Sequence, residues 1–254
     1  MPVETPESFS ENGVEPLEEK WWASFEDENL NSLVDSALTS NLTIKNSWYR
    51  LKEAQAVVDR ESASFFPDIF TNLQGETGSG QSAFEVNDNV RMGLNADYEI
   101  DLWGRIRSEV DAERYREDAS FSDFQTAAIT LSAEIVLTWY RLAEAQQQLQ
   151  ISKEQTEINN RVLNLIKTRF GSGQTRSVDI LRQEQLVEAS IENQLFQETR
   201  IEILKNQLDI LLGNSPQEEN NYINTTLPQL PPLPETGLPV ELVRRRPDVQ
   251  SAYY

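Results

Sequence analysis

Cysteine and histidine are both absent from this 254-residue chain, and methionine occurs only twice. Without cysteine there is no disulfide framework, thiolate metal site or cysteine nucleophile. Without histidine the chain also lacks the commonest general base and the commonest metal ligand of proteins. Carboxylate chemistry stays possible in principle, because 42 aspartates and glutamates are available. We nevertheless expect no cofactor, no metal site and no enzyme activity.

Positive charge is scarce, because 22 lysines and arginines stand against 42 aspartates and glutamates and give a net charge of −20. Nucleic acid is not an expected partner, since phosphate contacts require clustered basic side chains. The one arginine run, residues 244–246, is short and precedes a proline. We interpret the many carboxylates as a solvated surface.

Long apolar runs are missing too. No stretch approaches the roughly 18–20 apolar residues of a helix that spans a bilayer. Residues 1–6 are acidic and contain no apolar signal-peptide core, and residues 1–20 are expected to form a disordered lead. Composition alone suggests a soluble acidic protein, but the pattern along the chain indicates something else.

Three segments have helical periodicity. The first is expected at 27–64, with Asp27 or Asn29 as N-cap and Pro67 as stop signal. The second, at 105–170, contains neither proline nor glycine, and about 65 residues at 1.5 Å each extend about 100 Å. This segment is too polar to span a membrane, so we expect it to pack against other helices. Its apolar residues form one stripe in the middle, Leu131, Ile135, Trp139, Leu142 and Leu149, and another near the end, Ile158, Val162, Leu165, Ile166 and Phe170.

A glycine-containing turn separates the second helical segment from the third, which is expected at 177–212. Thr175 or Ser177 is suited to cap this last helix, and Asp179 suits its first turn. Gly213 and then Pro216 end it. The two segments therefore predict an antiparallel helical hairpin.

Two strands are expected between the first two helical segments, at 67–80 and 88–103, joined by a Gly- and Ser-rich turn. Apolar and polar residues alternate from Val90 to Leu102, over more residues than the ~5–6 of an average strand. A soluble sandwich strand also alternates, but this length suits the ~9–11 residues of a tilted strand that crosses a bilayer. The expected lipid-facing residues are Val90, Met92, Leu94, Ala96, Tyr98 and Ile100, and the expected barrel-lumen residues are Asn95, Asp97, Glu99 and Asp101.

Residues 214–240 are rich in proline and are expected to form an extended linker. After it, residues 242–249 repeat the pattern of residues 37–44, in which an apolar pair is followed by a polar turn and a further apolar residue. We therefore expect a first structural repeat at 21–213 and the truncated start of a second repeat at 241–254.

Together these segments resemble the TolC-like outer-membrane efflux factors, in particular their lipoprotein branch. Single motifs among them are unspecific, but they follow the family's order over nearly the whole chain. The matching residues are Trp22 to Phe25 with Leu30, Leu33, Ala37, Leu38 and Asn41; Phe66-Pro67; Tyr98 to Arg105; Arg169-Phe170 with Gly173, Asp179, Ile180 and Leu181; Leu211 to Gly213; and Gly237 to Asp248.

The resemblance implies a fold that is mainly α with a β-hairpin, in which a long helical hairpin belongs to a periplasmic α-barrel and two strands belong to a trimeric outer-membrane β-barrel. It implies a passive conduit for small molecules, located in bacterial outer-membrane lipid and extending into the periplasm. The implied partners are two further copies in a homotrimer, a periplasmic adaptor protein and an inner-membrane efflux pump. In the family the helical turn contacts the adaptor, which assigns that role to Arg169, Phe170, Gly171, Gly173, Thr175, Arg176, Ser177 and Asp179.

The sequence departs from the family pattern in several respects. It has no cysteine for lipidation, no signal peptide and little of the second repeat, which predicts a fragment truncated at both ends. Arg176 replaces a small hydroxyl residue, so partner contacts at the turn are expected to differ in detail.

Other interpretations stay open. The turn is also explained as a plain interhelical connection, the acidic strand face as generic surface charge, and Trp103 as either an interface aromatic or a packed turn residue. For the whole chain the alternative is a soluble periplasmic or cytoplasmic coiled-coil scaffold or adaptor, which explains the helices but not the alternation. An enzyme is not favoured, since Asp97 and Asp101 lack a catalytic partner.

Overall fold

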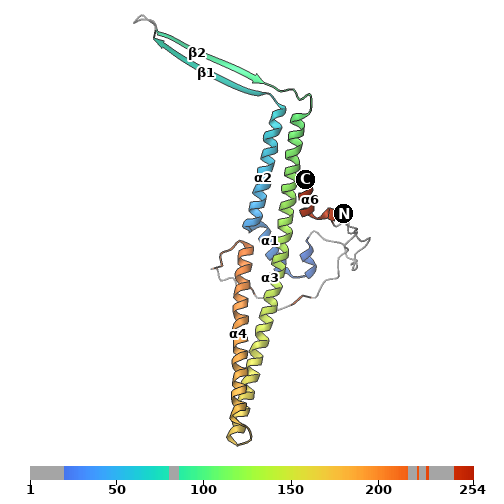
Figure 1. Ribbon diagram of the computed structural model, residues 1–254, viewed down its shortest axis with the longest axis vertical. Coiled ribbons are helices and arrows are strands. Elements are labelled where there is room, and N and C mark those ends of the chain that lie inside the picture. Colours follow the sequence, from blue (N-terminus) through green and yellow to red (C-terminus); the bar gives the residue numbers. More distant parts are fainter. Residues whose placement is uncertain (1–19, 80–85, 217–221, 223–226, 229–242) are drawn as a thin grey trace. The chain divides into compact units, whose positions relative to one another are not determined.

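The computed structural model describes residues 20–79, 86–216, 222, 227–228 and 243–254. The expected N-terminal lead, the turn between the strands and most of the proline-rich linker lie outside these residues. The described residues form helices and one antiparallel strand pair (Figure 1). They divide into two compact units: unit 1 is Met1–Asn46 with Gln125–Arg246, and unit 2 is Ser47–Phe124 with Pro247–Tyr254.

The core of unit 1 is formed by helices. The 3₁₀ turn η1 (Trp21–Phe25) and helix α1 (Glu28–Ser40) accompany the later part of α3 (Arg105–Gly171), and α4 (Ser177–Leu212) runs beside α3 (Figure 1). The bounds of α3 and α4 agree with the two predicted helices. Burying an aliphatic side chain here stabilises the fold by about 1.5–3 kcal/mol. The buried apolar residues include Leu30, Val34, Ala37, Leu131, Ile135, Trp139, Leu142, Leu204 and Leu208.

Asp27 connects the start of α1 to α3. Its Oδ1 accepts a 3.1 Å hydrogen bond from the Leu30 amide, so Asp27 is the N-cap of α1, as predicted. Its Oδ2 accepts a 2.8 Å hydrogen bond from Trp139 Nε1. One carboxylate therefore satisfies a helix start and a buried indole at the same time.

The single helix predicted at 27–64 is wrong, because two helices occupy this segment. Helix α1 ends at Ser40, and α2 (Leu42–Ser62) begins after Asn41, whose ψ of 132° lies outside the helical region. Asn41 Oδ1 accepts hydrogen bonds from the amides of Thr43 (2.8 Å) and Ile44 (3.2 Å), which makes it the cap of α2. Its Nδ2 donates a 2.8 Å bond to the Leu211 carbonyl of α4. This contact across the fold explains the break.

Helix α4 ends beside the junction between α1 and α2. Gly213 has φ 78°, its amide donates to the Ile210 carbonyl (3.0 Å), and the Asn214 amide donates to the Asp209 carbonyl (2.8 Å), which is a Schellman motif. A Cβ atom on residue 213 would lie 2.9 Å from the backbone oxygen of Ser40. Both the positive φ and the close approach of α1 therefore require glycine here.

Unit 2 is built around the first part of α3. Trp48 of α2 packs against Phe124, with ring centroids 5.6 Å apart. The short helix α6 (Pro247–Tyr253) reaches the same part of α3 through a 2.6 Å hydrogen bond from Ser251 Oγ to Asp123. Residue 246, like residue 41, is a non-helical position between helical residues. The repeated sequence pattern thus has a counterpart in the local structure.

Strands β1 (Asp68–Ser79) and β2 (Val86–Asp97) form the hairpin of unit 2. They pair antiparallel in a continuous register from Asp68 opposite Asp97 to Ser79 opposite Val86. Strand β1 begins at Asp68, one residue after its predicted start at 67. Strand β2 ends at Asp97, six residues before its predicted end at 103.

Candidate functional surfaces

The hairpin separates apolar from polar side chains, because directly paired residues share one face of a sheet. The side chains of Ile69, Leu73, Val90, Met92 and Leu94 are 68–79% exposed. In the described hairpin, each of the two strands has one edge whose backbone groups are not paired with another strand. An exposed apolar face on such a strand pair requires a covering surface. The apolar face pairs Ile69, Thr71, Leu73 and Gly75 with Ala96, Leu94, Met92 and Val90, and the opposite face pairs Asp68, Phe70, Asn72 and Gln74 with Asp97, Asn95, Gly93 and Arg91.

The polar face carries the two expected lumen residues that lie within the strand. Asn95 Nδ2 donates a 3.1 Å hydrogen bond to Asn72 Oδ1 on the neighbouring strand. Asp97 stands opposite Asp68, so two carboxylates face each other where the hairpin begins and ends. Like charges in direct opposition are unfavourable, and this pair does not stabilise the hairpin.

The prediction that β2 continues through residues 98–103 is wrong. Asp101 Oδ2 accepts a 3.0 Å hydrogen bond from the Arg107 amide at the start of α3, and this bond holds the pKa of Asp101 below its usual 3.8. Glu99 pairs instead with Arg105 through contacts of 2.7 and 3.3 Å. The start of α3 therefore binds both carboxylates, Asp101 through a backbone amide and Glu99 through the guanidinium of Arg105.

The lumen and lipid-facing assignments of residues 98–101 relied on that continuation, and they stay predictions for residues that lie beyond the end of β2. Glu99 and Asp101 belong to the junction between hairpin and α3 and not to the polar face of β2. Tyr98 and Ile100 are not part of its apolar face, although they are 58% and 67% exposed.

The turn between α3 and α4 brings the eight predicted tip residues together at one end of unit 1 (Figure 1). Gly173 has φ 75°, and its amide donates to the Phe170 carbonyl at 2.9 Å, while the Gln174 amide donates to the Arg169 carbonyl at 2.9 Å. This Schellman motif ends α3 just after Gly171. The tip is therefore a tight turn with defined hydrogen bonds.

The start of α4 differs from the prediction in its cap. Residue 176 occupies the N-cap position, and Asp179 Oδ2 accepts a 3.1 Å hydrogen bond from its amide. Neither Thr175 nor Ser177 is the cap, since Ser177 is the first helical residue. The hydroxyl of Thr175 is buried without a hydrogen-bond partner in the described part of the chain.

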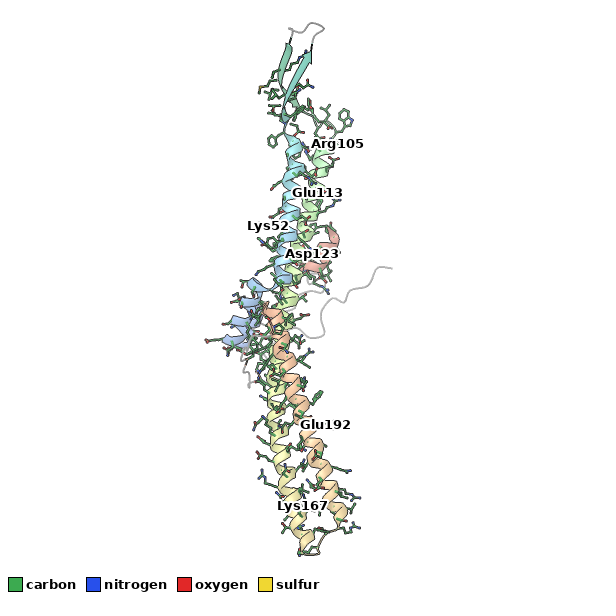
Figure 2. All side chains as sticks on the ribbon, turned by 90° about the vertical axis from the view of Figure 1, so that its left-hand side faces the viewer. Lys52, Arg105, Glu113, Asp123, Lys167 and Glu192 are labelled. Atoms are coloured by element: carbon green, nitrogen blue, oxygen red, sulfur yellow. The ribbon has the colours of Figure 1, made fainter. Side chains whose placement is uncertain are left out.

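Basic side chains gather near this tip. Residues 161–182 contain five lysines and arginines and one acid, Asp179, in a chain with a net charge of −20. Lys167 pairs with Glu184 at 3.0 Å, and Figure 2 places Lys167 near the turn and Glu192 farther along α4. All five basic side chains are exposed: Arg161, Lys167, Arg169, Arg176 and Arg182.

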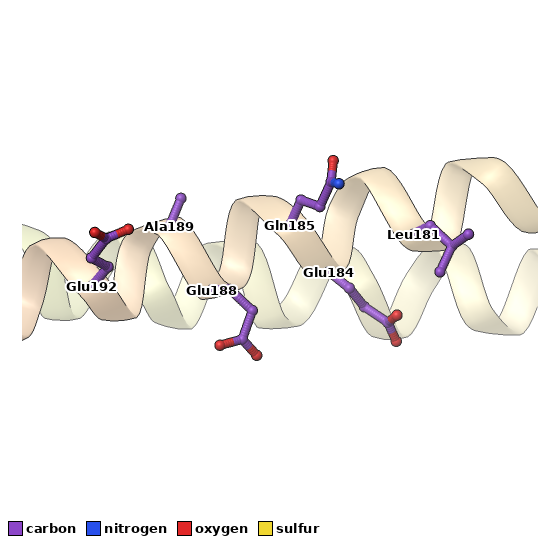
Figure 3. Close-up of a pocket in the computed structure, with 6 residues that line it drawn as sticks. All are labelled: Leu181, Glu184, Gln185, Glu188, Ala189 and Glu192. Carbon is purple, nitrogen blue, oxygen red and sulfur yellow. The ribbon is translucent and has the colours of Figure 1, made fainter.

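Helix α4 carries a surface hollow of about 660 Å³ that was not predicted from the sequence. Its side chains follow three successive turns of the helix (Figure 3). The available signal was the spacing of residues 181, 185, 188 and 192 at intervals of four and three. We call this hollow the α4 groove; it is lined by Leu181, Glu184, Gln185, Glu188, Ala189 and Glu192.

In the part of the chain that the structure describes, no helix has both the length and the apolar character to cross a membrane. The same residues contain no group of three or more His, Cys, Asp or Glu side chains that lies close enough to hold a metal ion.

Known proteins resemble this chain in sequence. The pyoverdine export outer membrane protein OpmQ of Pseudomonas putida is 26% identical over 251 residues, covering 92% of this chain and 52% of OpmQ. The cation efflux system protein CusC of Escherichia coli K12 is 24% identical, covering 99% of this chain and 56% of CusC. The chain spans about half the length of the curated relatives it matches.

Solved structures resemble it in fold. The outer-membrane channel OprN superimposes with a TM-score of 0.81 at 26% identity, covering 99% of this chain and 59% of OprN. The CmeC outer membrane channel of Campylobacter jejuni gives 0.81 at 25% identity, covering 97% and 54%. The expected fold, mainly helical with a β-hairpin, is confirmed.

The family profile described as outer membrane efflux protein matches residues 33–214. The relatives and structures named above are export, efflux and outer-membrane channel proteins, which are transporters rather than enzymes, and these similarities do not favour a coiled-coil scaffold. The resemblance read from the ordered motifs is thereby confirmed. The chain belongs to the outer membrane efflux protein family.

Proposed function

We propose that this chain works in an outer-membrane channel of a tripartite efflux or secretion system, as a passive conduit for small molecules that an inner-membrane pump drives outward. The observation that carries the proposal is the hairpin, with its 12-residue strands and one exposed apolar face, on the helices of an outer membrane efflux protein. A strand of that length suffices to cross a bilayer when tilted.

In this proposal Val90, Met92, Leu94 and Ala96 contact lipid, and Asn95 and Asp97 line the lumen, where their polarity favours cations. Two strands alone would leave unpaired backbone groups in lipid, at a cost of several kcal/mol for each group. A homotrimer supplies neighbouring strands, which supports closure of the barrel. The chain itself carries out no reaction on the transported molecule.

The tip supplies the contact with a periplasmic adaptor protein. The exposed Arg169, Phe170 and Arg176, together with the tight turn at Gly173, give a small, well-defined surface. The relatives OpmQ and CusC are named as export and efflux proteins, which supports a role in systems that include a pump.

Neighbouring residues on opposite faces of β2 provide the test. Leu94→Lys places a charge on the apolar face, where lysine near the bilayer midplane costs about 2–4 kcal/mol. Asn95→Lys, one position away on the polar face, is its matched control. With both variants made in the complete gene, we expect Leu94→Lys to deplete the protein from the outer-membrane fraction and Asn95→Lys to leave it there. Equal membrane levels would contradict the proposed faces.

A further inference from the structure

Tyr222 lies in the segment that follows α4 and is bound by both long helices of unit 1. Its hydroxyl donates a 2.7 Å hydrogen bond to Asp209 Oδ1 on α4. Its carbonyl accepts a 3.0 Å hydrogen bond from Gln146 Nε2 on α3. One residue therefore bonds to α4 through its side chain and to α3 through its backbone. We call this pair of hydrogen bonds the Tyr222 anchor.

Asp209 is a deeply buried partner in the anchor, with only 3% of the residue exposed. Taking a carboxylate out of water is costly unless hydrogen bonds replace the water that it loses. The Tyr222 hydroxyl supplies one of these bonds, and a hydrogen bond to a charged group is stronger than one between neutral groups. Removal of the hydroxyl should therefore cost more than the loss of an ordinary surface hydrogen bond.

Asp209 also holds the segment after α4 at a second point. Its carbonyl accepts the 2.8 Å hydrogen bond from the Asn214 amide that ends α4. Eight positions separate Asn214 from Tyr222 in the sequence, yet both residues bond to Asp209. The chain thus leaves α4 and returns to the last turn of the same helix. Closing such a short loop takes conformational freedom from both of its ends.

The anchor lies at the end of the α3–α4 pair that is remote from the turn (Figure 1). Arg200 of α4 also pairs with Glu144 of α3 near this end, at 2.9 Å. That contact joins the two helices directly, whereas the anchor joins them through the connecting segment. Because Tyr222 bonds to one residue on each helix, sliding or rotation of α4 against α3 would break at least one of its two bonds.

We propose that Tyr222 is a positioning residue that fastens the segment after α4 across α3 and α4. Its anchor closes the loop that begins at Asn214 and fixes the position of α4 on α3 at this end of the pair. This role concerns the connection between α4 and α6, and it does not depend on the proposed conduit.

Hydrogen exchange, followed by mass spectrometry on protein made from the complete gene, tests the anchor at the amides of Gly213 and Asn214. Tyr222→Phe is expected to speed their exchange about tenfold, because loss of a bond to a carboxylate favours local opening. Asp209→Ala keeps the carbonyl that binds Asn214 and should have a similar effect. Adding Tyr222→Phe to it should change the rate less than about twofold, since the hydroxyl has then already lost its acceptor.

Gln146→Leu tests the bond to α3. It should speed exchange of the same amides about threefold, because a bond between neutral groups is weaker than one to a carboxylate. Two matched controls should change the rate less than about twofold. Tyr49→Phe removes the hydroxyl of a tyrosine that is 69% exposed, and Gln150→Leu repeats the α3 substitution one turn farther along, on an exposed residue.

Three outcomes would overturn the proposal. Tyr222→Phe could have no more effect than Tyr49→Phe, or its effect could multiply with that of Asp209→Ala as for independent sites. Gln146→Leu could have no more effect than Gln150→Leu, in which case α3 would not hold the anchor. Equal acceleration in peptides from β1 and β2 would mean a general loss of stability in place of local release.

Discussion

Replacing Gly213 with alanine would test the junction where α4 ends beside α1. The new Cβ would force residue 213 to keep a φ of 78°, which costs an L-residue about 1–2 kcal/mol. It would also stand 2.9 Å from the Ser40 oxygen and 3.2 Å from its carbonyl carbon, both backbone atoms. Relief of such a clash costs a further ~1–3 kcal/mol. We therefore expect a total loss of about 2–5 kcal/mol.

Gly173 provides the matched control in the same unit. Its φ is 75°, but a Cβ atom there would meet nothing within 4 Å. Gly173→Ala should thus lose only the conformational part, about 1–2 kcal/mol. Both variants would be unfolded in urea and followed by circular dichroism and by tryptophan fluorescence, to which the buried Trp22 and Trp139 contribute. The midpoint should fall farther for Gly213→Ala. Equal shifts would refute the close approach of α1 to α4.

Three further predictions follow from hydrogen bonds and charge. Trp139→Phe removes the donor to Asp27 and should reduce the free energy of unfolding by about 2 kcal/mol, measured by urea titration; a change below about 0.5 kcal/mol would mean that the bond is not stabilising. Because the pKa of Asp101 is lowered on folding, its contribution is present above pH 3.8 and is lost as the pH falls through the folded-state value. Exchange of the Arg107 amide should therefore become less protected in acid, and Asp101→Asn should abolish that pH dependence. In planar bilayers the complete channel with Asp97→Lys should prefer cations less than the unaltered channel, as measured by the reversal potential; an unchanged potential would exclude Asp97 from the lumen.

The sequence predicted best those features that depend on local signals. The absence of proline and glycine from 105–170 predicted α3, and the Schellman glycines at 173 and 213 marked the ends of α3 and α4. Alternation in 90–97 likewise predicted the two faces of β2. It failed beyond Asp97 because Glu99 and Asp101, which continue the pattern, bind Arg105 and the Arg107 amide at the helix start.

Contacts between distant segments explain what the sequence did not predict. Asn41 breaks a helix because its side chain bonds the end of α4, 170 residues away in the chain. Helix α3 also carries apolar stripes on more than one side: Leu163 is buried, whereas Ile158, Leu165 and Phe170 are 45–54% exposed. Periodicity shows that such stripes exist but not which one meets α4. The adaptor contacts of the tip remain a proposal, since a partner surface leaves no local signal in one chain.

The segment of α3 between Tyr115 and Phe124 receives two helices that begin with the same sequence pattern. Trp48 of α2 packs on Phe124, and Ser251 bonds to the adjacent Asp123, while Tyr254 stacks on Tyr115 with centroids 6.2 Å apart. The two helices therefore use different residues of one segment of α3, and substitutions at sites without a shared partner usually have additive costs. Trp48→Ala and Tyr254→Ala are expected to lower the free energy of unfolding by independent amounts, so one helix start can change its side chains without constraining the other.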